Sequence, residues 1–186
     1  MNVFSVDAET DGLYGHVWAI GAVVLDGADE VARFAGQLDP DDTRFPPFRR
    51  GVTDPWVREH IVPVVDLPRF ASHRLLIEAF WGFWMEHRES SIAVADFGAP
   101  VEAGLFRVCV AQDEQARMFQ GPYPLHELGT ALLLAGLDPD CDRRGMSGRL
   151  DLVPHDPVDD ALASGLCWQM IAAGGAAYRP RYASGA

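Results

Sequence analysis

The sequence contains no lysine. All 15 of its basic residues are arginines, and 27 aspartates and glutamates outnumber them, which gives a formal net charge of −12. Tight, non-specific binding of a long nucleic-acid duplex requires many basic contacts to phosphate, so this balance argues against it. A site that holds only the end of a strand is still compatible with the charge, because metal cations can neutralise the phosphates there.

Cysteine is scarce, and long apolar runs are absent. Cys109, Cys141 and Cys167 are odd in number and show no CxxC spacing, which indicates reduced thiols and neither a disulfide framework nor a zinc site. No segment approaches the roughly 18 apolar residues of a membrane span. The N-terminus also lacks a basic stretch followed by an apolar core, as in a secretory signal. We therefore expect a cytoplasmic protein that makes no membrane contact.

The bulk composition is that of a globular protein. Of the 186 residues, 48% are hydrophobic and 23% are charged, which suits one domain with a substantial core. We expect a single domain over residues 1–175. The tail over residues 176–186 is expected to be poorly ordered.

Two acids stand close together near the N-terminus. Asp7 and Glu9 follow a short apolar run at positions i and i+2, and on a strand this spacing directs both side chains to one face of a sheet. Two adjacent carboxylates repel each other and raise each other's pKa, so a divalent cation between them is the economical explanation. Mg²⁺ and Mn²⁺ suit such hard oxygen ligands. The alternative without a metal ion is a pair of solvated acids at the end of an edge strand.

More chemistry-bearing residues lie far along the chain. His155 and Asp160 add a base and a carboxylate, and Asp96 and Glu102 flank a short apolar segment in the middle of the sequence. A two-metal phosphodiesterase needs several carboxylates around cations about 3.5–4 Å apart, together with a base for the attacking water. Histidine suits the base because its ordinary pKa is close to neutrality.

Hydrophobic periodicity predicts an α/β chain. The expected strands cover residues 2–6, 16–25, 30–37 and Ser91–Ala95, and short turns between the first three indicate an antiparallel meander. The expected helices are a short one that starts after Thr53, an amphipathic one over 67–88, one that opens at 101–107, one within 122–134, and one over 159–173. The polar segment 138–148 is predicted to be a surface loop.

With these motifs in this order, the sequence resembles the DnaQ-like DEDDh 3'-5' exonucleases, which have a ribonuclease H-like fold. Their first motif, Asp-x-Glu followed by Thr and Gly-Leu, is matched by Asp7, Glu9, Thr10, Gly12 and Leu13. Their third motif, His-x4-Asp followed by Ala, is matched by His155, Asp160 and Ala161. The segments AIGAVVL and GVTDPW are similar to the family's second strand and to the segment before its long helix.

The resemblance implies a fold and an activity. The fold would be a central mixed five-stranded sheet, with its first three strands antiparallel, flanked by helices. The domain over residues 1–175 would be a 3'-5' exonuclease that acts on the 3' end of a short single strand of RNA or DNA, releases nucleoside 5'-monophosphates, and forms a homodimer. Two further interpretations stay open: a hydrolase of small nucleotides or dinucleotides, and a catalytically degenerate nucleic-acid-binding module.

The resemblance also implies roles for individual residues. Asp7, Glu9, Asp160 and one acid of the middle motif would hold two Mg²⁺ or Mn²⁺ ions. His155 would be the general base, and Thr10 and Leu13 would contact the terminal nucleotide. The five other histidines match no motif, so we interpret them as surface or structural residues: His16, His60, His73, His87 and His126. Arg143, Arg144 and Arg149 lie near the third motif and are candidates for phosphate contacts, but the interpretation that we favour is a solvated basic loop.

The middle motif departs from the family pattern. The family usually has an Asp a few residues after the middle strand, where a helix opens. An ungapped alignment puts Glu102 at that position, whereas Asp96 falls a few residues earlier, at the end of the strand. Glutamate can replace aspartate as a metal ligand but carries one more methylene group. Both acids are candidates, and the register favours Glu102.

Overall fold

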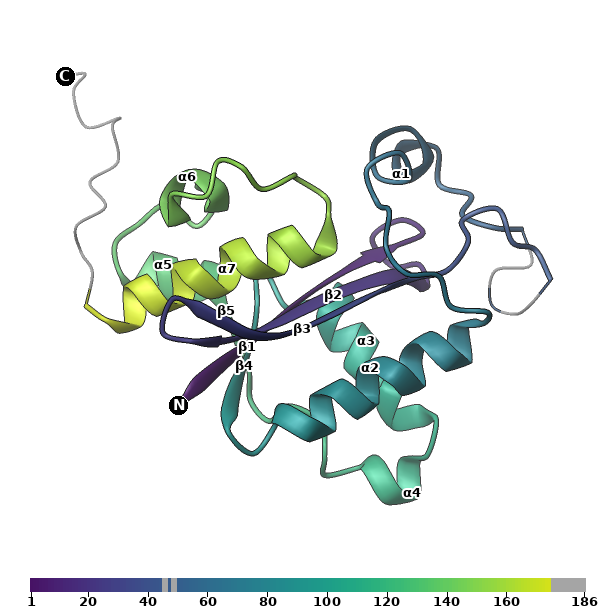
Figure 1. Ribbon diagram of the computed structural model, residues 1–186, viewed down its shortest axis with the longest axis horizontal. Helices are drawn as coiled ribbons and strands as arrows, with labels where there is room; N and C mark the ends of the chain where they lie inside the picture. Colours follow the sequence, from purple (N-terminus) through teal and green to yellow (C-terminus); the bar gives the residue numbers. More distant parts are fainter. Residues whose placement is uncertain (45–46, 48–49, 175–186) are drawn as a thin grey trace.

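The computed structural model describes residues 1–44, 47 and 50–174 and contains one five-stranded sheet of order β3-β2-β1-β4-β5 (Figure 1). The strands are β1 (Asn2–Thr10), β2 (Val17–Asp26), β3 (Asp29–Gln37), β4 (Ser91–Ala95) and β5 (Leu125–Glu127). The first three pair antiparallel, β4 is parallel to β1, and β5 is parallel to β4. This order and these strand directions confirm the predicted ribonuclease H-like fold.

Helices cover both faces of the sheet. They are α1 (Pro55–His60), α2 (His73–His87), α3 (Val101–Ala111), α4 (Glu114–Arg117), α5 (Leu128–Leu134), α6 (Arg143–Ser147) and α7 (Pro157–Ala172). Figure 1 places α2 and α3 on one face and α5, α6 and α7 on the other. Across the described part of the chain, no helix is both long and apolar enough to cross a membrane.

Alternation along β1 separates two cores. Phe4 contacts Phe80 and Trp84 of α2 through edge-to-face ring pairs with centroids 6.3 and 5.0 Å apart. Val3 belongs to the opposite core, which α5 and α7 cover. Because side chains alternate along a strand, the odd-numbered positions face α7. Asp7 and Glu9 therefore share the α7 face, as their i, i+2 spacing predicts.

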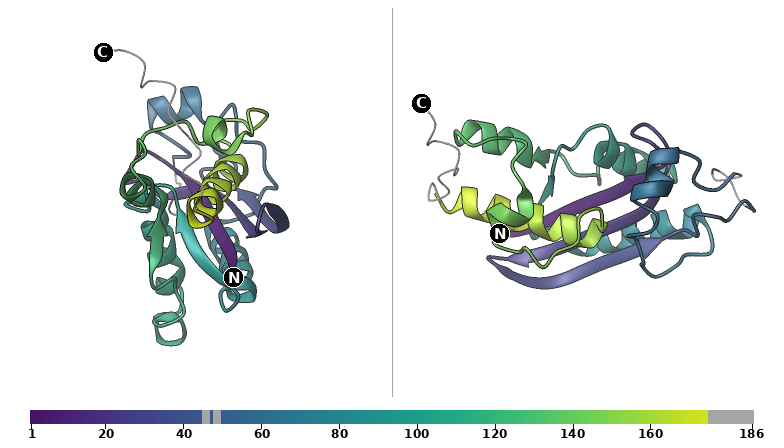
Figure 2. Two further views of the ribbon diagram at one scale, coloured as in Figure 1. Left: turned by 90° about the vertical axis from the view of Figure 1, so that its left-hand side faces the viewer. Right: turned by 90° about the horizontal axis from the view of Figure 1, so that it is seen from above.

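Two glycines allow α7, which runs across the strands in the view from above (Figure 2), to lie close against them. Gly21 of β2 pairs directly with Asp7, and a Cβ atom there would lie only 2.2 Å from the backbone carbonyl carbon of Pro157. Within α7, a Cβ atom on Gly165 would lie 2.9 Å from the Cβ atom of Ser5. Each substitution would force backbone or side-chain shifts, so these glycines fix how near the start of α7 comes to β1.

Several predicted element boundaries are wrong. The first strand runs to Thr10 and not only to residue 6. The helix expected over 67–88 begins at His73, because Arg69 forms a bridge to Gln37 and Ser72 caps the helix. The segment expected to be a loop over 138–148 contains α6, which starts at the capping residue Asp142.

Two further differences concern the second half of the chain. The helix expected within 122–134 starts only at Leu128, because the preceding residues form β5 at the sheet edge, and α4 was not expected. The predicted poorly ordered tail, residues 176–186, lies outside the described residues.

Candidate metal and catalytic site

The centre of the site lies where β1 leaves the pairing with β4. Asp7 and Glu9 follow the last β4-paired residue, Val6, and both are mostly buried. Burial is the main cause that raises the pKa of Asp7 well above its ordinary value, followed by the charges of Glu102 and Glu9. Burial and the neighbouring carboxylate of Asp160 raise the pKa of Glu9 to about 8. A carboxylate in such surroundings is stabilised by a proton or a cation.

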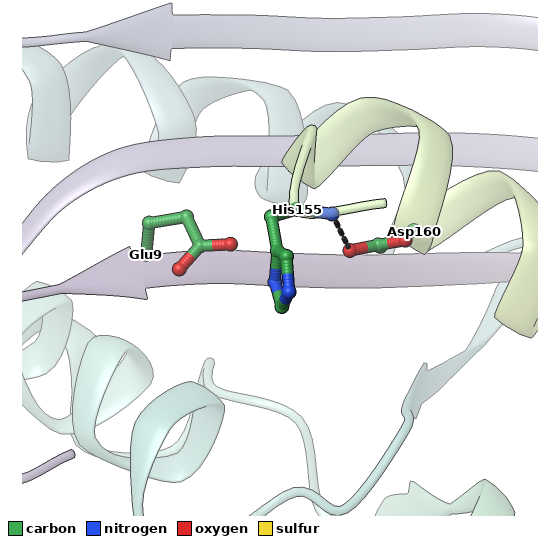
Figure 3. A group of neighbouring side chains, drawn as sticks. All are labelled: Glu9, His155 and Asp160. Atoms are coloured by element: carbon green, nitrogen blue, oxygen red, sulfur yellow. Dashed lines mark hydrogen bonds between the residues drawn. The ribbon is translucent and has the colours of Figure 1, made fainter. Parts of the chain in front are cut away.

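The start of α7 brings the third motif to the same place. The Asp156 side chain caps the helix by accepting from the backbone N–H groups of Val158 and Asp159. The Asp160 carboxylate accepts from the backbone N–H of His155 at 2.8 Å (Figure 3), and Asp159 accepts from Val153 at the same distance. These contacts hold the loop that carries the imidazole against the first turn of α7.

The histidine side chain points toward the acids. One ligand atom each of Glu9, His155 and Asp160 lies within 4.8 Å of the others (Figure 3). His155 has a backbone φ of 65°, in the left-handed region that non-glycine residues seldom adopt. Such local strain persists only when surrounding contacts stabilise it, and it is concentrated at functional sites.

Glu102 approaches from the other side of β1. It lies in the first turn of α3 and is only 7% exposed. Burial raises its pKa to about 7, and the nearby backbone N–H groups of Glu102 itself and Ala8 limit the rise, because they favour the ionised carboxylate. Ala8 stands between the two acids of the first motif, so the Glu102 carboxylate lies beside the segment that carries them.

Asp96 lies at the same centre but already has a cationic partner. Its carboxylate accepts from Arg143 Nε and Nη2 at 2.9 and 2.7 Å, and the arginine side chain is only 10% exposed. Burial raises the pKa of Asp96, while the hydrogen bonds and charge of Arg143 lower it. The interpretation of Arg143 as part of a solvated loop is therefore wrong, since it connects α6 to the end of β4.

The charges of the cluster are mostly uncompensated. Of the described residues that line the cavity at Asp7 and Asp160, the cations are Arg143 and Arg144. Arg143 is bound to Asp96, and Arg144 is bound to Asp142. Burial and the charge of Asp96 raise the pKa of Asp160 to about 6, although the hydrogen bond from the backbone N–H of His155 lowers it. Several carboxylate oxygens with one imidazole nitrogen match the ligand chemistry of Mg²⁺ or Mn²⁺.

Aromatic residues of α1 adjoin the imidazole. The Trp56 ring meets the His155 ring edge-on at 5.7 Å and stacks on His60 at 4.9 Å. Burial, followed by the charge of His60, lowers the pKa of His155, so its ring is neutral at neutral pH and able to accept a proton. The Asp11 side chain anchors this segment by accepting from the backbone N–H groups of Thr53 and Asp54.

The structure brings together every acid and the base that the sequence singled out. Thr10 and Leu13 line a neighbouring pocket, Thr10 buried and Leu13 exposed. The sequence interpretation did not find Trp56, His60 or Arg143 at the site. The segment GVTDPW was the available signal for Trp56, because it matched the family, but nothing in it indicated a contact with His155.

The sheet order and the acidic cluster together define a protein with a ribonuclease H-like fold and a candidate two-metal site. No protein-family model matches the sequence, and no curated protein matches it. Among solved structures, the chain is similar to the nuclease domain of 3'hExo, a DEDDh family member, bound to rAMP. The TM-score is 0.48 at 12% identity, and the match covers 96% of this chain and 94% of that chain. The site assignment rests on the contacts and charges described above.

Proposed function

We propose that this protein is a metal-dependent 3'-5' exonuclease whose single domain occupies residues 1–175. One observation carries the proposal: Asp7, Glu9, Glu102 and Asp160, from three separate elements, gather at one end of β1 with raised pKa values, beside the imidazole of His155. Acids held together without cations cost folding free energy, so this arrangement is best explained by bound divalent ions.

The reaction would be in-line hydrolysis of the terminal phosphodiester. An imidazole nitrogen of His155 takes a proton from the attacking water, and the new P–O bond forms as the bond to the 3' oxygen breaks. The released nucleotide keeps the phosphate on its 5' oxygen, and the shortened strand takes a proton on its 3' oxygen. Two Mg²⁺ or Mn²⁺ ions, when bound, would polarise the phosphate and stabilise the departing oxygen.

Glu102 is the preferred ligand of the middle motif. Asp96 is neutralised by Arg143 at 2.7 Å, whereas Glu102 forms no ion pair with another described residue, and its charge raises the pKa of Asp7. A bound cation stabilises a carboxylate that has no counter-charge more than one that already has a counter-charge. We therefore propose Asp7, Glu9, Glu102 and Asp160 as the ligands and Asp96 as an anchor for α6.

The substrate is proposed to be the 3' end of a short single strand of RNA or DNA, with Thr10 and Leu13 against the terminal nucleotide. A homodimer is the expected assembly. The second candidate is a hydrolase of small nucleotides or dinucleotides, which the net charge of −12 and the lack of lysine favour. A binding module with a degenerate site is disfavoured, because it would retain clustered buried charge without use.

The test is hydrolysis of a 5'-labelled single-stranded RNA and its DNA counterpart with Mg²⁺ or Mn²⁺. The full chain is compared with an EDTA control, with His155→Ala, and with His87→Ala, a histidine at the far end of α2. We expect a ladder that shortens from the 3' end, that EDTA and His155→Ala abolish or strongly reduce, and that His87→Ala leaves unchanged.

Other outcomes separate the candidates. Hydrolysis confined to mononucleotides or dinucleotides would support the small-nucleotide hydrolase. Absence of hydrolysis with either metal, from a folded protein that binds the strand, would instead support the binding module and contradict both enzyme proposals.

A further inference from the structure

A large apolar pocket lies where α3 ends, on the face of the sheet opposite α7 (Figure 1). Its volume is 540 Å³. Along the axis of α3, Val110 lies about 12 Å beyond Glu102, at a rise of about 1.5 Å per residue, so the pocket is separate from the acidic centre. Residues of α3 and of the segment after α4 line it, and we call them the α3–α4 surface: Phe106, Arg107, Val110, Met118, Phe119 and Tyr123.

Three side chains of the α3–α4 surface are exposed to solvent. Phe119 is 89% exposed, Met118 is 53% exposed, and Tyr123 is fully exposed. A single exposed apolar side chain is ordinary, whereas several around one pocket mark a contact surface. A neighbouring pocket of 300 Å³ shares Tyr123 and extends the lining to Ile92 of β4. A surface of this extent fits another folded chain better than one small molecule.

The composition of the pocket is also that of a protein interface. Aromatic residues, methionine and arginine are enriched at interfaces, whereas aspartate, glutamate, lysine, serine and alanine are depleted. The pocket is lined by two phenylalanines, a tyrosine, a methionine and Arg107, and none of its described lining residues belongs to the depleted types. The residue types therefore indicate a protein partner.

Two copies of this chain would meet at the α3–α4 surface without bringing carboxylates together. Each copy has a net charge of −12, so two copies repel each other through most of their faces. Among the described residues that line the two pockets there is no aspartate or glutamate. Of the faces that a second copy could use, this one avoids the repulsion between acids.

The surface is also complementary to itself. In a two-fold symmetric contact, both copies use the same patch, so the patch must contain both a projecting group and a place to receive it. Phe119 projects into solvent beside the pocket that it lines. The pocket volume of 540 Å³ lies within the range of about 300–1,000 Å³ for pockets that enclose an organic molecule, so it has room for an aromatic ring from the other copy.

The exposed area is sufficient for a stable contact. A buried Phe or Tyr side chain removes about 150–250 Å² from water, so Phe119 and Tyr123 of two copies would together bury about 600–1,000 Å². Met118 and the walls of both pockets add to this area. The total then exceeds the roughly 1,000 Å² that a specific interface needs.

We propose that two copies of this chain form a homodimer through the α3–α4 surface, with Phe119 of each copy in the pocket of the other around a two-fold axis. This inference rests on the homodimer in the proposed function and adds its contact surface. It does not depend on hydrolysis, because the surface contains none of the proposed catalytic residues.

The experiment measures the mass of the full chain by sedimentation and light scattering over a hundredfold range of concentration. We expect twice the 20.4 kDa of one chain. Phe119→Asp and Tyr123→Ser should each raise the dimer dissociation constant by more than about 100-fold, because each removes an aromatic anchor that occurs twice in the interface. Leu134→Asp is the control, since Leu134 is 84% exposed on α5. Added NaCl should not weaken the dimer, because it screens repulsion between the acidic chains.

Three results would overturn the proposal. The first is an unaltered protein that stays monomeric at every concentration, which would leave the surface to a different protein. The second is a dimer that Phe119→Asp and Tyr123→Ser do not weaken, which would place the contact elsewhere. The third is a monomer whose affinity for single-stranded RNA falls in Phe119→Asp and with added NaCl, which would assign the surface to a nucleic acid.

These measurements need no turnover, so they separate this inference from the proposed exonuclease. A dimer that Phe119→Asp dissociates supports the inference even if the protein hydrolyses no nucleic acid. An active nuclease that is monomeric would contradict the inference and leave the proposed reaction standing.

Discussion

Asp7 is the residue around which the site is built. It lies on the central strand β1, and its pKa is raised first by burial and then by the charges of four other carboxylates: Glu102, Glu9, Asp160 and Asp96. Without a cation, the folded protein must either protonate this group or accept repulsion in surroundings of low dielectric constant. As a proposed metal ligand, Asp7 would contribute to metal binding at the expense of the stability of the metal-free chain.

Substitution of Asp7 by Asn tests whether metal binding and the stability of the metal-free protein are opposed in this way. The variant keeps the shape of the side chain and removes its charge, so we expect the metal-free protein to melt at the same temperature or higher, by about 2–4 °C for each kcal/mol gained. Nuclease activity should fall by more than about 100-fold. This loss exceeds the one expected when a residue that only hydrogen-bonds a metal ligand is replaced. Thermal melts with and without Mn²⁺ and a nuclease assay provide the readouts, with the exposed Asp29→Asn as control. Full activity in Asp7→Asn would refute the role of this ligand.

Glu102 and Asp96 are expected to respond differently to neutralisation. Glu102→Gln should abolish most of the thermal stabilisation by Mn²⁺ and most activity, because it removes a metal ligand. Asp96→Asn should destabilise the protein by about 1–3 kcal/mol, because the buried Arg143 loses its carboxylate partner, and should keep much of the response to Mn²⁺. Chemical denaturation and melting curves separate the two. The reverse pattern would assign the ligand role to Asp96.

At the scale of elements, the site depends on how closely α7 approaches β1 and β2. The acids of the first motif are carried by β1, whereas Asp160 and the loop of His155 are carried by α7. Only a residue without a side chain at position 21 allows the backbone at Pro157 to pack against β2. The register of the two motifs is therefore set by packing that involves none of the proposed catalytic groups.

Gly21→Ala should disrupt this register. Its Cβ atom would lie 2.2 Å from backbone atoms of α7, so the helix must shift, at a cost of about 1–3 kcal/mol. A displacement of about 1 Å between catalytic groups can reduce the rate by roughly 100-fold. Gly82→Ala, which meets open space in α2, should be neutral or slightly stabilising. Unfolding curves and kcat are measured for both variants. A fully active Gly21→Ala would show that the close approach of α7 to β2 is not needed for activity.

The elements also show how far the sequence could predict this structure. Alternation along residues 3–9 correctly placed both acids on one face, and the resemblance to the exonuclease family implied the sheet. The sequence could not reveal that residues 125–127 pair with β4, because three residues carry no periodic signal. Nor could it reveal the ion pair of Asp96 with Arg143, the contact of Trp56 with His155, or the need for Gly21, since each depends on segments brought together only by the fold.

At the scale of the whole molecule, the acidic cluster makes stability depend on pH. The pKa of Glu9 is about 8 and that of Glu102 about 7 in the folded protein, both above their unfolded values. The folded state therefore binds more protons than the unfolded state between about pH 4.5 and 8. Stability of the metal-free protein should fall as the pH rises through this range, by at most about 1.4 kcal/mol per pH unit for each proton.

Divalent cations should weaken this dependence on pH. Saturating Mg²⁺ replaces the protons, so we expect the loss of stability between pH 5 and 8 to shrink, and metal binding to release protons. Urea titrations at several pH values, with EDTA or with Mg²⁺, give the comparison. A metal-free stability that rises across this range would contradict the raised pKa values.

The most direct test of the account is a count of the metal ions that the acidic cluster binds. Titration of the full chain with Mn²⁺ at pH 8, followed by calorimetry and electron paramagnetic resonance, should give two ions per chain with release of protons, and weaker or fewer sites in Asp7→Asn but not in Asp29→Asn. Failure of the unaltered protein to bind Mn²⁺, or equal binding by Asp7→Asn, would contradict the assignment of this cluster as a metal centre and the hydrolytic function that depends on it.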